Sequence, residues 1–513
     1  MEETMKVLFV DFDTLRPDHL GCYGYRRNTS PIIDSIAREG VRFNEYYCSD
    51  APCLPSRAAL ISGRFGIRNG IVGHGGTASD RRLTGYDRGM QDLQDTGNFN
   101  NIFRRAGMYT CSISTFPERH SAWWFSAGMN ETFNEGSIGL ESGEAVVPYA
   151  LNWLDNNGTS RENWFLHVHL WDPHTPYRVP MNFGNPFEGD DLLDWCWIDE
   201  EALTRHKKIY GPHTVNELNM FNDNETPVLP RNPGRIDDLS GIRRVMDGYD
   251  CGIAYADYCL GQIVDKMKAL GIYEDTAIIL TGDHGENFGE LGAYAEHGTA
   301  DRPCCNIPFI IKWPGCCQGT VDNEFHYSLD FLPTLCDLLD VDKNEDWDGI
   351  SFVDTLKTGA ACGRESLVLS QMAHVCQRSA RFGDWLYIRT VNDGFHNWDS
   401  EMLFNLKDDP YEQKDVKEKY PEICAKGAKI ILDWVDENMK KNATQIDPMW
   451  TVYHEGGPFH AHENSLAVYE QRLRSTGREA EADELLKRHE KYAPKPVPSV
   501  PNPTLQLLFG DTK

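Results

Sequence analysis

The sequence predicts an α/β protein in which a large, doubly wound and mostly parallel sheet is flanked by helices. Short runs rich in β-branched and aromatic residues alternate with longer helical patterns over residues 1–362. Three of these runs end in Asp or His groups, and such sheets bind ligands beyond the carboxyl ends of their strands. After Gly363 the alternation of strand and helix patterns ends, which predicts a smaller C-terminal α+β subdomain with a short antiparallel sheet.

Each expected element follows from a local pattern. Apolar residues at helical spacing predict a helix over Ile242–Leu270. Runs of buried character predict the strands of the large sheet at Lys6–Phe12, Tyr109–Ser114, Trp164–Trp171, Thr276–Thr281 and Ile307–Trp313.

The C-terminal part divides in two. Short strands are expected at Leu367–Gln371 and Trp385–Thr390, followed by the segment Met402–Leu406, a turn at Asp408–Pro410 and an amphipathic helix over Pro421–Met439. A charged helical segment, Glu463–His489, then leads into the Pro-rich stretch Ala493–Pro503. We therefore expect a catalytic domain over residues 1–362, an α+β subdomain over 363–446 and a tail over 447–513.

Composition limits the partners and the compartment. A formal charge of −28 disfavours nucleic acid and long polyanions, so an anionic substrate needs a locally positive pocket. Fifteen cysteines, an odd number without C-x-x-C spacing, suggest reduced thiols. The N-terminus lacks the basic and long apolar regions of a signal peptide, and no stretch approaches the ~20 apolar residues of a membrane span. The sequence thus predicts a cytoplasmic protein with no membrane partner.

Polar side chains follow three predicted strands. Asp11 and Asp13 end the first, and Asp283 and His284 end the fourth. Carboxylate oxygens suit a hard divalent cation, although Asp13 would also serve as a helix N-cap. His174, in a loop fixed by flanking prolines after the third strand, is expected at the same edge.

The run Cys53-Leu54-Pro55-Ser56-Arg57, continued to Arg64, contains a cysteine that would ordinarily be a buried thiol. In company with four further motifs it resembles the type I sulfatases of the alkaline-phosphatase superfamily. Those motifs are Asp13-Thr14-Leu15-Arg16-Pro17-Asp18, Asp172-Pro173-His174, Gly282-Asp283-His284-Gly285-Glu286, and Leu403–Leu406 with Asp409–Glu412. The resemblance covers Val7 to Trp434, and it implies an alkaline-phosphatase-like fold.

The resemblance also implies chemistry. A maturation enzyme, formylglycine-generating or radical, would oxidise Cys53 to formylglycine, the precursor of the attacking group. Asp13, Asp283 and His284 would join position 53 in holding Ca²⁺ (or Mg²⁺ or Mn²⁺), and Arg57 would support the nucleophile. A sulfate ester is shielded by negative oxygens, so catalysis rests on neutralising charge and positioning the attack. His174 or His297 would protonate the departing alkoxide.

Several positions depart from the family pattern. Thr14 stands where many members have a second acid, and Asp11 is either a replacement metal ligand or a neighbour, since strand alternation puts it on the same face as Asp13. Thr115 and His297 fall at the places of two family lysines. A threonine at the place of the first lysine is similar to the phosphonate monoester hydrolase branch. In the geometry of that branch, His74 would approach the metal.

The substrate is less constrained. We expect a small sulfated molecule, first a sulfated sugar and second an aryl or steroid sulfate. A phosphonate monoester or phosphodiester hydrolase on the same scaffold is the alternative enzyme, and a sulfated-glycan-binding protein without turnover is the alternative class. Trp197 and Tyr453 are candidates for the pocket mouth, because sugars and flat rings stack on aromatic side chains, but ordinary packing would explain them equally well.

Overall fold

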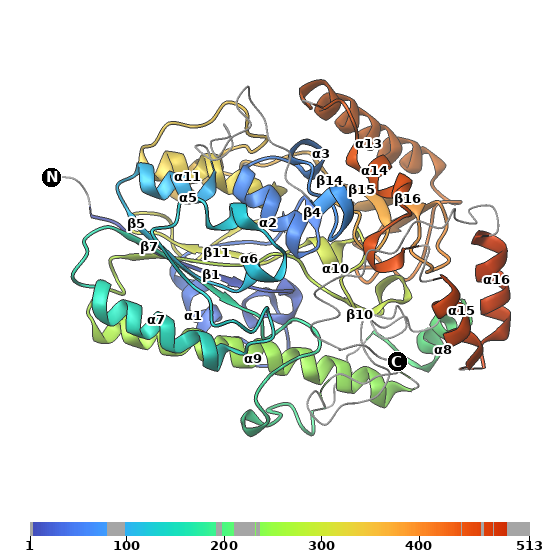
Figure 1. The fold of residues 1–513 in the computed structure, drawn as a ribbon, viewed down its shortest axis with the longest axis horizontal. Helices are drawn as coiled ribbons and strands as arrows, with labels where there is room; N and C mark the ends of the chain where they lie inside the picture. Colours follow the sequence, from blue (N-terminus) through green and yellow to red (C-terminus); the bar gives the residue numbers. More distant parts are fainter. Residues whose placement is uncertain are drawn as a thin grey trace.

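The computed structural model describes residues 4–79, 98–190, 197–209, 231, 236, 238–442, 444–462, 466–475 and 477–489. An eight-stranded sheet runs through its larger part (Figure 1). In spatial order its strands are β12 (Thr320–Asp322), β2 (Val41–Phe43), β11 (Phe309–Lys312), β8 (Thr276–Gly282), β1 (Lys6–Phe12), β7 (Trp164–Leu170), β5 (Tyr109–Ile113) and β6 (Glu131–Phe133).

The sheet is mostly parallel, as predicted. Strand β1 lies at its centre and pairs in parallel with β7 and β8 along its whole length. Strand β11 is antiparallel to both of its neighbours, β2 and β8. The chain therefore has the predicted α/β fold, with one reversed strand in the large sheet.

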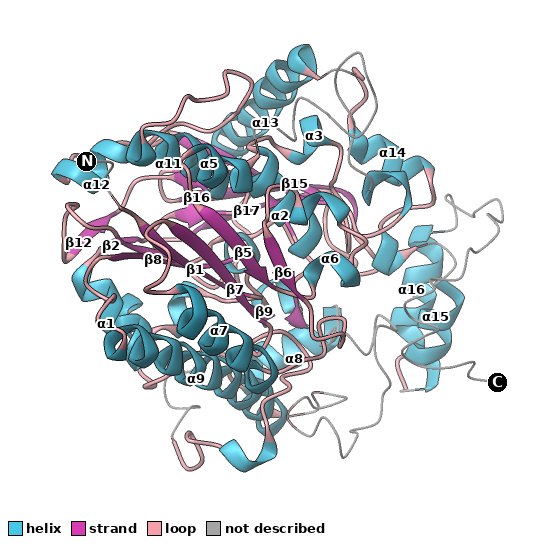
Figure 2. Ribbon diagram, turned by 60° about the vertical axis from the view of Figure 1, so that its left-hand side comes forward, coloured by secondary structure: helices cyan, strands magenta, loops and turns pink. Residues whose placement is uncertain are grey.

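Helices cover both faces of this sheet (Figure 2). Alternate residues of β1 enter two different cores: Leu8 and Val10 pack with one set of helices, and Val7 and Phe9 pack with the other. This alternation is what a strand buried on both faces requires. The first set is α1 (Pro31–Glu39), α7 (Gly143–Asn157) and α9 (Leu239–Ala269), and the second is α2 (Cys53–Ser62), α5 (Phe99–Arg105) and α11 (Phe331–Leu339).

Shorter elements connect these layers. The remaining α-helices of this part are α3 (Gly66–Asn69), α6 (Phe116–Arg119), α8 (Glu200–Ile209), α10 (Arg302–Cys305) and α12 (Val353–Thr358). Two small ribbons pair β3 (Tyr46–Tyr47) with β13 (His326–Tyr327), and β9 (Asn287–Phe288) with β10 (Tyr294–Glu296). Single 3₁₀ turns span Pro17–His19, Gly21–Tyr23, Gly76–Ser79, Trp123–Ser126, Met181–Phe183, Glu290–Gly292, Ser328–Asp330 and Phe459–Ala461.

A second sheet follows in the C-terminal part. Its order is β17 (Glu401–Asn405), β16 (Trp385–Asn392), β15 (Cys376–Phe382), β14 (Ser366–Gln371) and β4 (Asp50–Ala51). The first four strands are antiparallel, and α13 (Pro421–Lys441) packs on them. Sequence reasoning did not identify β15, whose residues Cys376–Phe382 are polar at several positions yet entirely buried. The division of the chain after residues 362 and 446 stays a prediction.

The described part of the tail contains α14 (Pro448–His454), α15 (Leu466–Ser475) and α16 (Glu479–His489). The single charged segment expected over Glu463–His489 is thus two helices. Between them Gly477 adopts a φ of 77°, a left-handed conformation that ends a helix and that glycine accepts without strain. The Pro-rich stretch 493–503 lies outside the described residues. Among the helices that are described, none combines the length and the apolar composition needed to cross a bilayer.

Candidate active site

Three neighbouring strands deliver polar side chains to one edge of the large sheet. Asp13 follows β1, and its two neighbours in the sheet lead to His174 after β7 and to Asp283 after β8. One donor atom each from Asp13, Cys53, Asp283 and His284 lies within 4.8 Å of the others, and all four residues are buried. The predicted clustering at the carboxyl ends of the strands therefore brings these four residues together.

Helix α2 supplies Cys53 and Arg57 to this cluster. Cys53 begins the helix and Arg57 lies four residues later, so both side chains are on the same face. Pro55 falls in the first turn, where a missing backbone N–H costs no intrahelical hydrogen bond. The helix ends at Gly63, whose φ of 68° and contact with Trp347 leave no room for a side chain.

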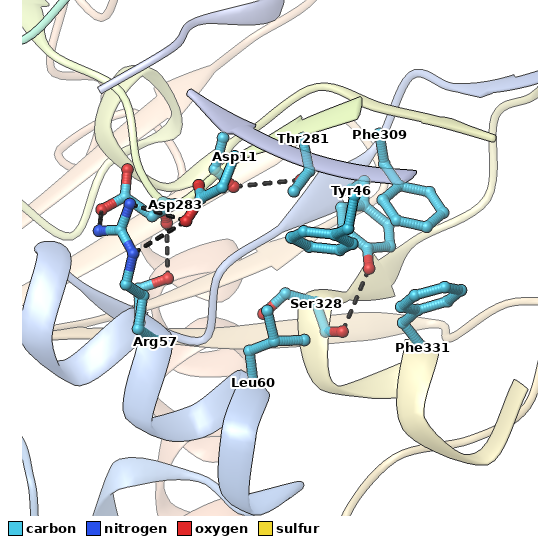
Figure 3. A pocket seen from close by; sticks show the side chains of 12 residues that line it. Asp11, Tyr46, Arg57, Leu60, Thr281, Asp283, Phe309, Ser328 and Phe331 are labelled. Carbon is cyan, nitrogen blue, oxygen red and sulfur yellow. Dashed lines mark hydrogen bonds and ion pairs between the residues drawn. The ribbon is translucent and has the colours of Figure 1, made fainter. Parts of the chain in front are cut away.

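Arg57 is the charge centre of the site. Its guanidinium is ion-paired with Asp11 (2.8 Å), Asp13 (3.1 Å) and Asp283, and Figure 3 shows it turned toward Asp11 and Asp283. Arg57 Nη2 also donates to His169 Nε2 over 2.8 Å. One buried guanidinium thus faces three buried carboxylates.

The carboxyl groups of Asp11, Asp13 and Asp283 differ in their pKa values. Burial alone would raise the pKa of each, and the charge of Arg57 opposes it. The balance lowers the pKa of Asp11 to about 2 and holds that of Asp13 well below its usual value. For Asp283 burial outweighs Arg57, and repulsion by Asp13 adds to it, so its pKa rises to about 6.

His284 has the ring orientation of a metal ligand. Its Nδ1 donates to the carbonyl of Gly285 over 2.8 Å, which leaves the lone pair of Nε2 free. That Nε2 lies 3.5 Å from Asp283 Oδ2 and 3.8 Å from Asp13 Oδ1. The ionised carboxylates of Asp11, Asp13 and Asp283 against one Arg57 leave an excess of two negative charges. The residues present therefore fit a hard divalent cation.

Cys53 lies against this donor set. Its Sγ is 3.1 Å from His284 Nε2, and the side chain is 1% exposed. Burial, and then the charges of Asp13 and Asp283, raise the pKa of the thiol well above its ordinary value. Because the thiolate is the nucleophilic form of cysteine, an unmodified Cys53 would be unreactive near neutral pH.

Thr14 occupies the place of the missing second acid. Its φ of 63° is in the left-handed region, which is unusual for a β-branched residue. In this conformation its N–H donates to Asp283 Oδ1 over 3.0 Å and its hydroxyl donates to Asp13 Oδ1 over 2.9 Å. Thr14 therefore orients the two carboxylates.

His174 and His297 flank His284, with ring centroids 6.5 Å and 4.7 Å from it. His174 Nδ1 donates to the carbonyl of Thr175, so its Nε2 faces Asp13 Oδ1 at 3.9 Å. Burial lowers the pKa of His174 to about 3 and that of His297 well below its usual value. In the free protein both imidazoles are neutral at pH 7.

Sequence reasoning missed further histidines around the same centre. His120 and His460 have ring centroids 5.1 Å and 5.3 Å from His74, and His374 lies 5.3 Å from His297. His74 Nδ1 is 3.1 Å from His460 Nε2. His374 and His460 arrive from loops of the C-terminal part, which carry no local signal. His169 could have been found, because its register partner on β1 is Asp11.

Several predicted site residues make other contacts. Asp11 and His74 are not part of the four-residue donor group. The hydroxyl of Thr115 donates to Glu141 and accepts from Gly139 N and Trp171 Nε1, so it is fully engaged. Trp197 stacks on Tyr411 at 5.1 Å, and Tyr453 lines a cavity beside Phe395 and Trp398. The structure thus gives both aromatic side chains neighbours to pack against.

Comparisons with known proteins agree with this geometry. The family model described as Sulfatase matches residues 6–341. The N-acetylglucosamine-6-O-sulfatase of Bacteroides thetaiotaomicron is 23% identical to this chain, over 86% of this chain and 87% of its own length.

Two solved structures share the fold. One, a protein in complex with its substrate D-glucosamine-2-N,6-O-disulfate, has a TM-score of 0.63 at 18% identity and covers 87% of this chain and 99% of its own. The other is a phosphonate monoester hydrolase from Silicibacter pomeroyi, with a TM-score of 0.64 at 18% identity, covering 86% of this chain and 96% of its own. A phosphonate monoester hydrolase therefore shares this fold, so the fold alone does not distinguish such an enzyme from a sulfatase.

Proposed function

The chain belongs to the sulfatase family of the alkaline-phosphatase superfamily and is a sulfuric ester hydrolase, and we propose that it desulfates a small sulfated sugar with a formylglycine made from Cys53. One observation carries the proposal: Cys53 is buried among Asp13, Asp283 and His284, and burial raises the pKa of its thiol well above the ordinary value. A cysteine in that position is a poor nucleophile until it is converted to formylglycine. A maturation enzyme that recognises the Cys53–Arg57 segment is the implied partner.

In the proposed reaction the divalent ion, the formylglycine and the side chains of the site have different roles. A divalent ion on Asp13, Asp283 and His284 would neutralise sulfate oxygens, and hydrated formylglycine would supply the attacking hydroxyl and the second hydroxyl that expels sulfate. Arg57 holds the carboxylates of Asp13 and Asp283 in place.

Protonation of the leaving oxygen falls to His297 or His174. Both are neutral in the free protein, and an anionic ester beside an imidazole raises its pKa. Either ring could then hold the proton that a departing sugar alkoxide needs.

The substrate class rests on the relatives. One acts on N-acetylglucosamine-6-sulfate by its name, and one structural neighbour was solved with a disulfated glucosamine as its substrate. The strongly negative protein favours a small substrate over a long polyanion, because distant repulsion grows with the charge of the ligand.

Side-by-side rates test the proposal. Protein co-expressed with a formylglycine-generating enzyme should release sulfate from p-nitrophenyl sulfate and from mono-sulfated sugars, and Cys53→Ala should not. p-Nitrophenyl phenylphosphonate is the comparison substrate. A preference for the phosphonate of a hundredfold or more, or activity retained in Cys53→Ala, would overturn the proposal. The hydroxyl of Thr115, the feature that resembles the phosphonate branch, is already engaged by Glu141, Gly139 and Trp171.

A further inference from the structure

Two arginines lie side by side next to the site. Arg119 ends α6 and Arg178 follows the His174 loop, yet both donate through Nη1 to the carbonyl oxygen of Gly139, at 3.5 Å and 3.1 Å. Gly139 has a φ of 76°, and a side chain there would collide with Arg119. Two like charges are therefore held together by one backbone oxygen.

Neither guanidinium has a carboxylate within ion-pairing distance among the residues that the structure describes, although Arg57 alone has three. The acids whose charges act on Arg178 are Glu141, Asp13 and Asp172. Asp13 is ion-paired with Arg57, whereas Glu141 and Asp172 each accept through one oxygen, from Thr115 and from Gly143 N. Burial raises the pKa of Asp172 to about 7, and it raises that of Glu141 as well, which weakens their negative charge. In a chain with a net charge of −28, a pair of arginines without an ion-paired carboxylate in the described part of the chain is unexpected.

The pair is close to the reacting centre. The guanidinium of Arg119 lies 5.0 Å from the ring of Trp171, and that of Arg57 lies 6.0 Å from the same ring. The charges of both Arg119 and Arg178 act on His174, where they add to burial in lowering its pKa. Burial, and then repulsion by Arg119, lower the pKa of Arg178 itself to about 9.

A second observation points to a ligand here. His120, the residue after Arg119, has a buried Nε2 that finds no hydrogen-bond partner among the described residues. Its ring lies 5.1 Å from that of His74. An oxyanion beside Arg119 and Arg178 would accept from this nitrogen and from N–H groups of both guanidiniums.

We propose that Arg119 and Arg178 bind a second oxyanion of the substrate, next to the sulfate ester that is cleaved. The inference rests on the proposed function and narrows its substrate class to sugars with two anionic groups, the second being a carboxylate or another sulfate. Planar guanidinium groups bind both bidentately.

Calorimetric binding separates this inference from turnover. Cys53→Ala protein with Ca²⁺ would be titrated with matched probes: glucosamine-2-N,6-O-disulfate against N-acetylglucosamine-6-sulfate for a second sulfate, and a 2-O-sulfated uronate against the 2-O-sulfated neutral hexose for a carboxylate. We expect the doubly anionic member of at least one pair to bind about tenfold tighter or more. The pair that shows the difference identifies the second group.

Replacing both Arg119 and Arg178 with alanine should bring that ratio to within about twofold of unity, whereas Arg38→Ala, an exposed arginine of α1, should leave it unchanged. Lysine at both positions should restore part of this affinity ratio, because lysine returns the positive charge but not the planar, bidentate geometry of a guanidinium. No preference for either doubly anionic probe would overturn the inference. So would an equal loss of affinity for all probes in the double variant, which would assign the arginines to the cleaved sulfate. Failure of sulfate release by the matured enzyme would instead overturn the proposed function and leave these affinities measurable.

Discussion

Replacing Arg57 with methionine tests the charge balance of the site most directly. The change removes the guanidinium that is ion-paired with Asp11, Asp13 and Asp283, and it keeps a long apolar side chain in the same space. Removing one partner of a buried ion pair costs about 3–5 kcal/mol, because the other charge is left uncompensated. Three carboxylates share the loss here, so we expect the upper part of that range.

The expected shift in melting temperature follows from chain length. Unfolding entropy of about 2.1 cal/mol/K per residue gives roughly 1.1 kcal/mol/K for 513 residues. Arg57→Met should therefore melt about 4–5 °C below the wild type in EDTA. Saturating Ca²⁺ should raise the melting temperature of the variant more than that of the wild type, because the variant site carries three negative charges in place of two.

Differential scanning fluorimetry with and without Ca²⁺ measures both effects, and the exposed Arg38→Met is the matched control. A variant that melts with the wild type in EDTA would refute the argument that Arg57 balances these carboxylates. A Ca²⁺ shift equal in the two proteins would refute the argument that the excess negative charge belongs to a metal site.

Three further predictions concern the same centre and its support. Below pH 6, where Asp283 gains a proton, Ca²⁺ affinity measured by calorimetry should fall about tenfold per pH unit, and a flat profile from pH 7 to 5 would exclude Asp283 as a ligand. His297→Gln should lower kcat/KM about 10²–10⁴-fold for a sugar sulfate and far less for p-nitrophenyl sulfate, whose leaving group needs no proton; equal losses would argue against a general acid. His396 pairs with the buried Glu296 at 3.0 Å, and this pairing outweighs burial and raises the pKa of His396. Its stabilisation is complete below about pH 6.5 and is lost as pH rises through the raised pKa, so the melting temperature should fall toward alkaline pH in the wild type and fall less in His396→Gln.

The central part of the site was predictable because its residues follow buried strands. Strands β1, β7 and β8 are continuous apolar runs, and parallel pairing places their ends side by side. The positions of Asp13 and Asp283 follow from that rule alone. Cys53 and Arg57 required the resemblance to a family, since their helix α2 has no pattern that points to the sheet edge.

The surrounding histidines and arginines were not predictable in the same way. His374 and His460 reach the site from loops more than 75 residues beyond His297, and nothing in their local sequence marks them. Arg119 and Arg178 flank residues that the sequence did identify, Thr115 and His174, yet two separate loops must fold before they share the oxygen of Gly139. Their proximity therefore depends on the tertiary structure and has no signal in the local sequence.

This distribution of charge has a consequence for specificity. His174 and His297 are neutral in the free protein, so the centre itself offers an incoming anion little positive charge beyond that of a bound metal. Arg57 is already committed to three carboxylates. The guanidiniums of Arg119 and Arg178 are then nearby positive charges that remain available to a substrate. A sugar with one sulfate would use the metal alone, whereas a sugar with a second oxyanion would use both sets of positive charge, and this difference would separate the two in binding.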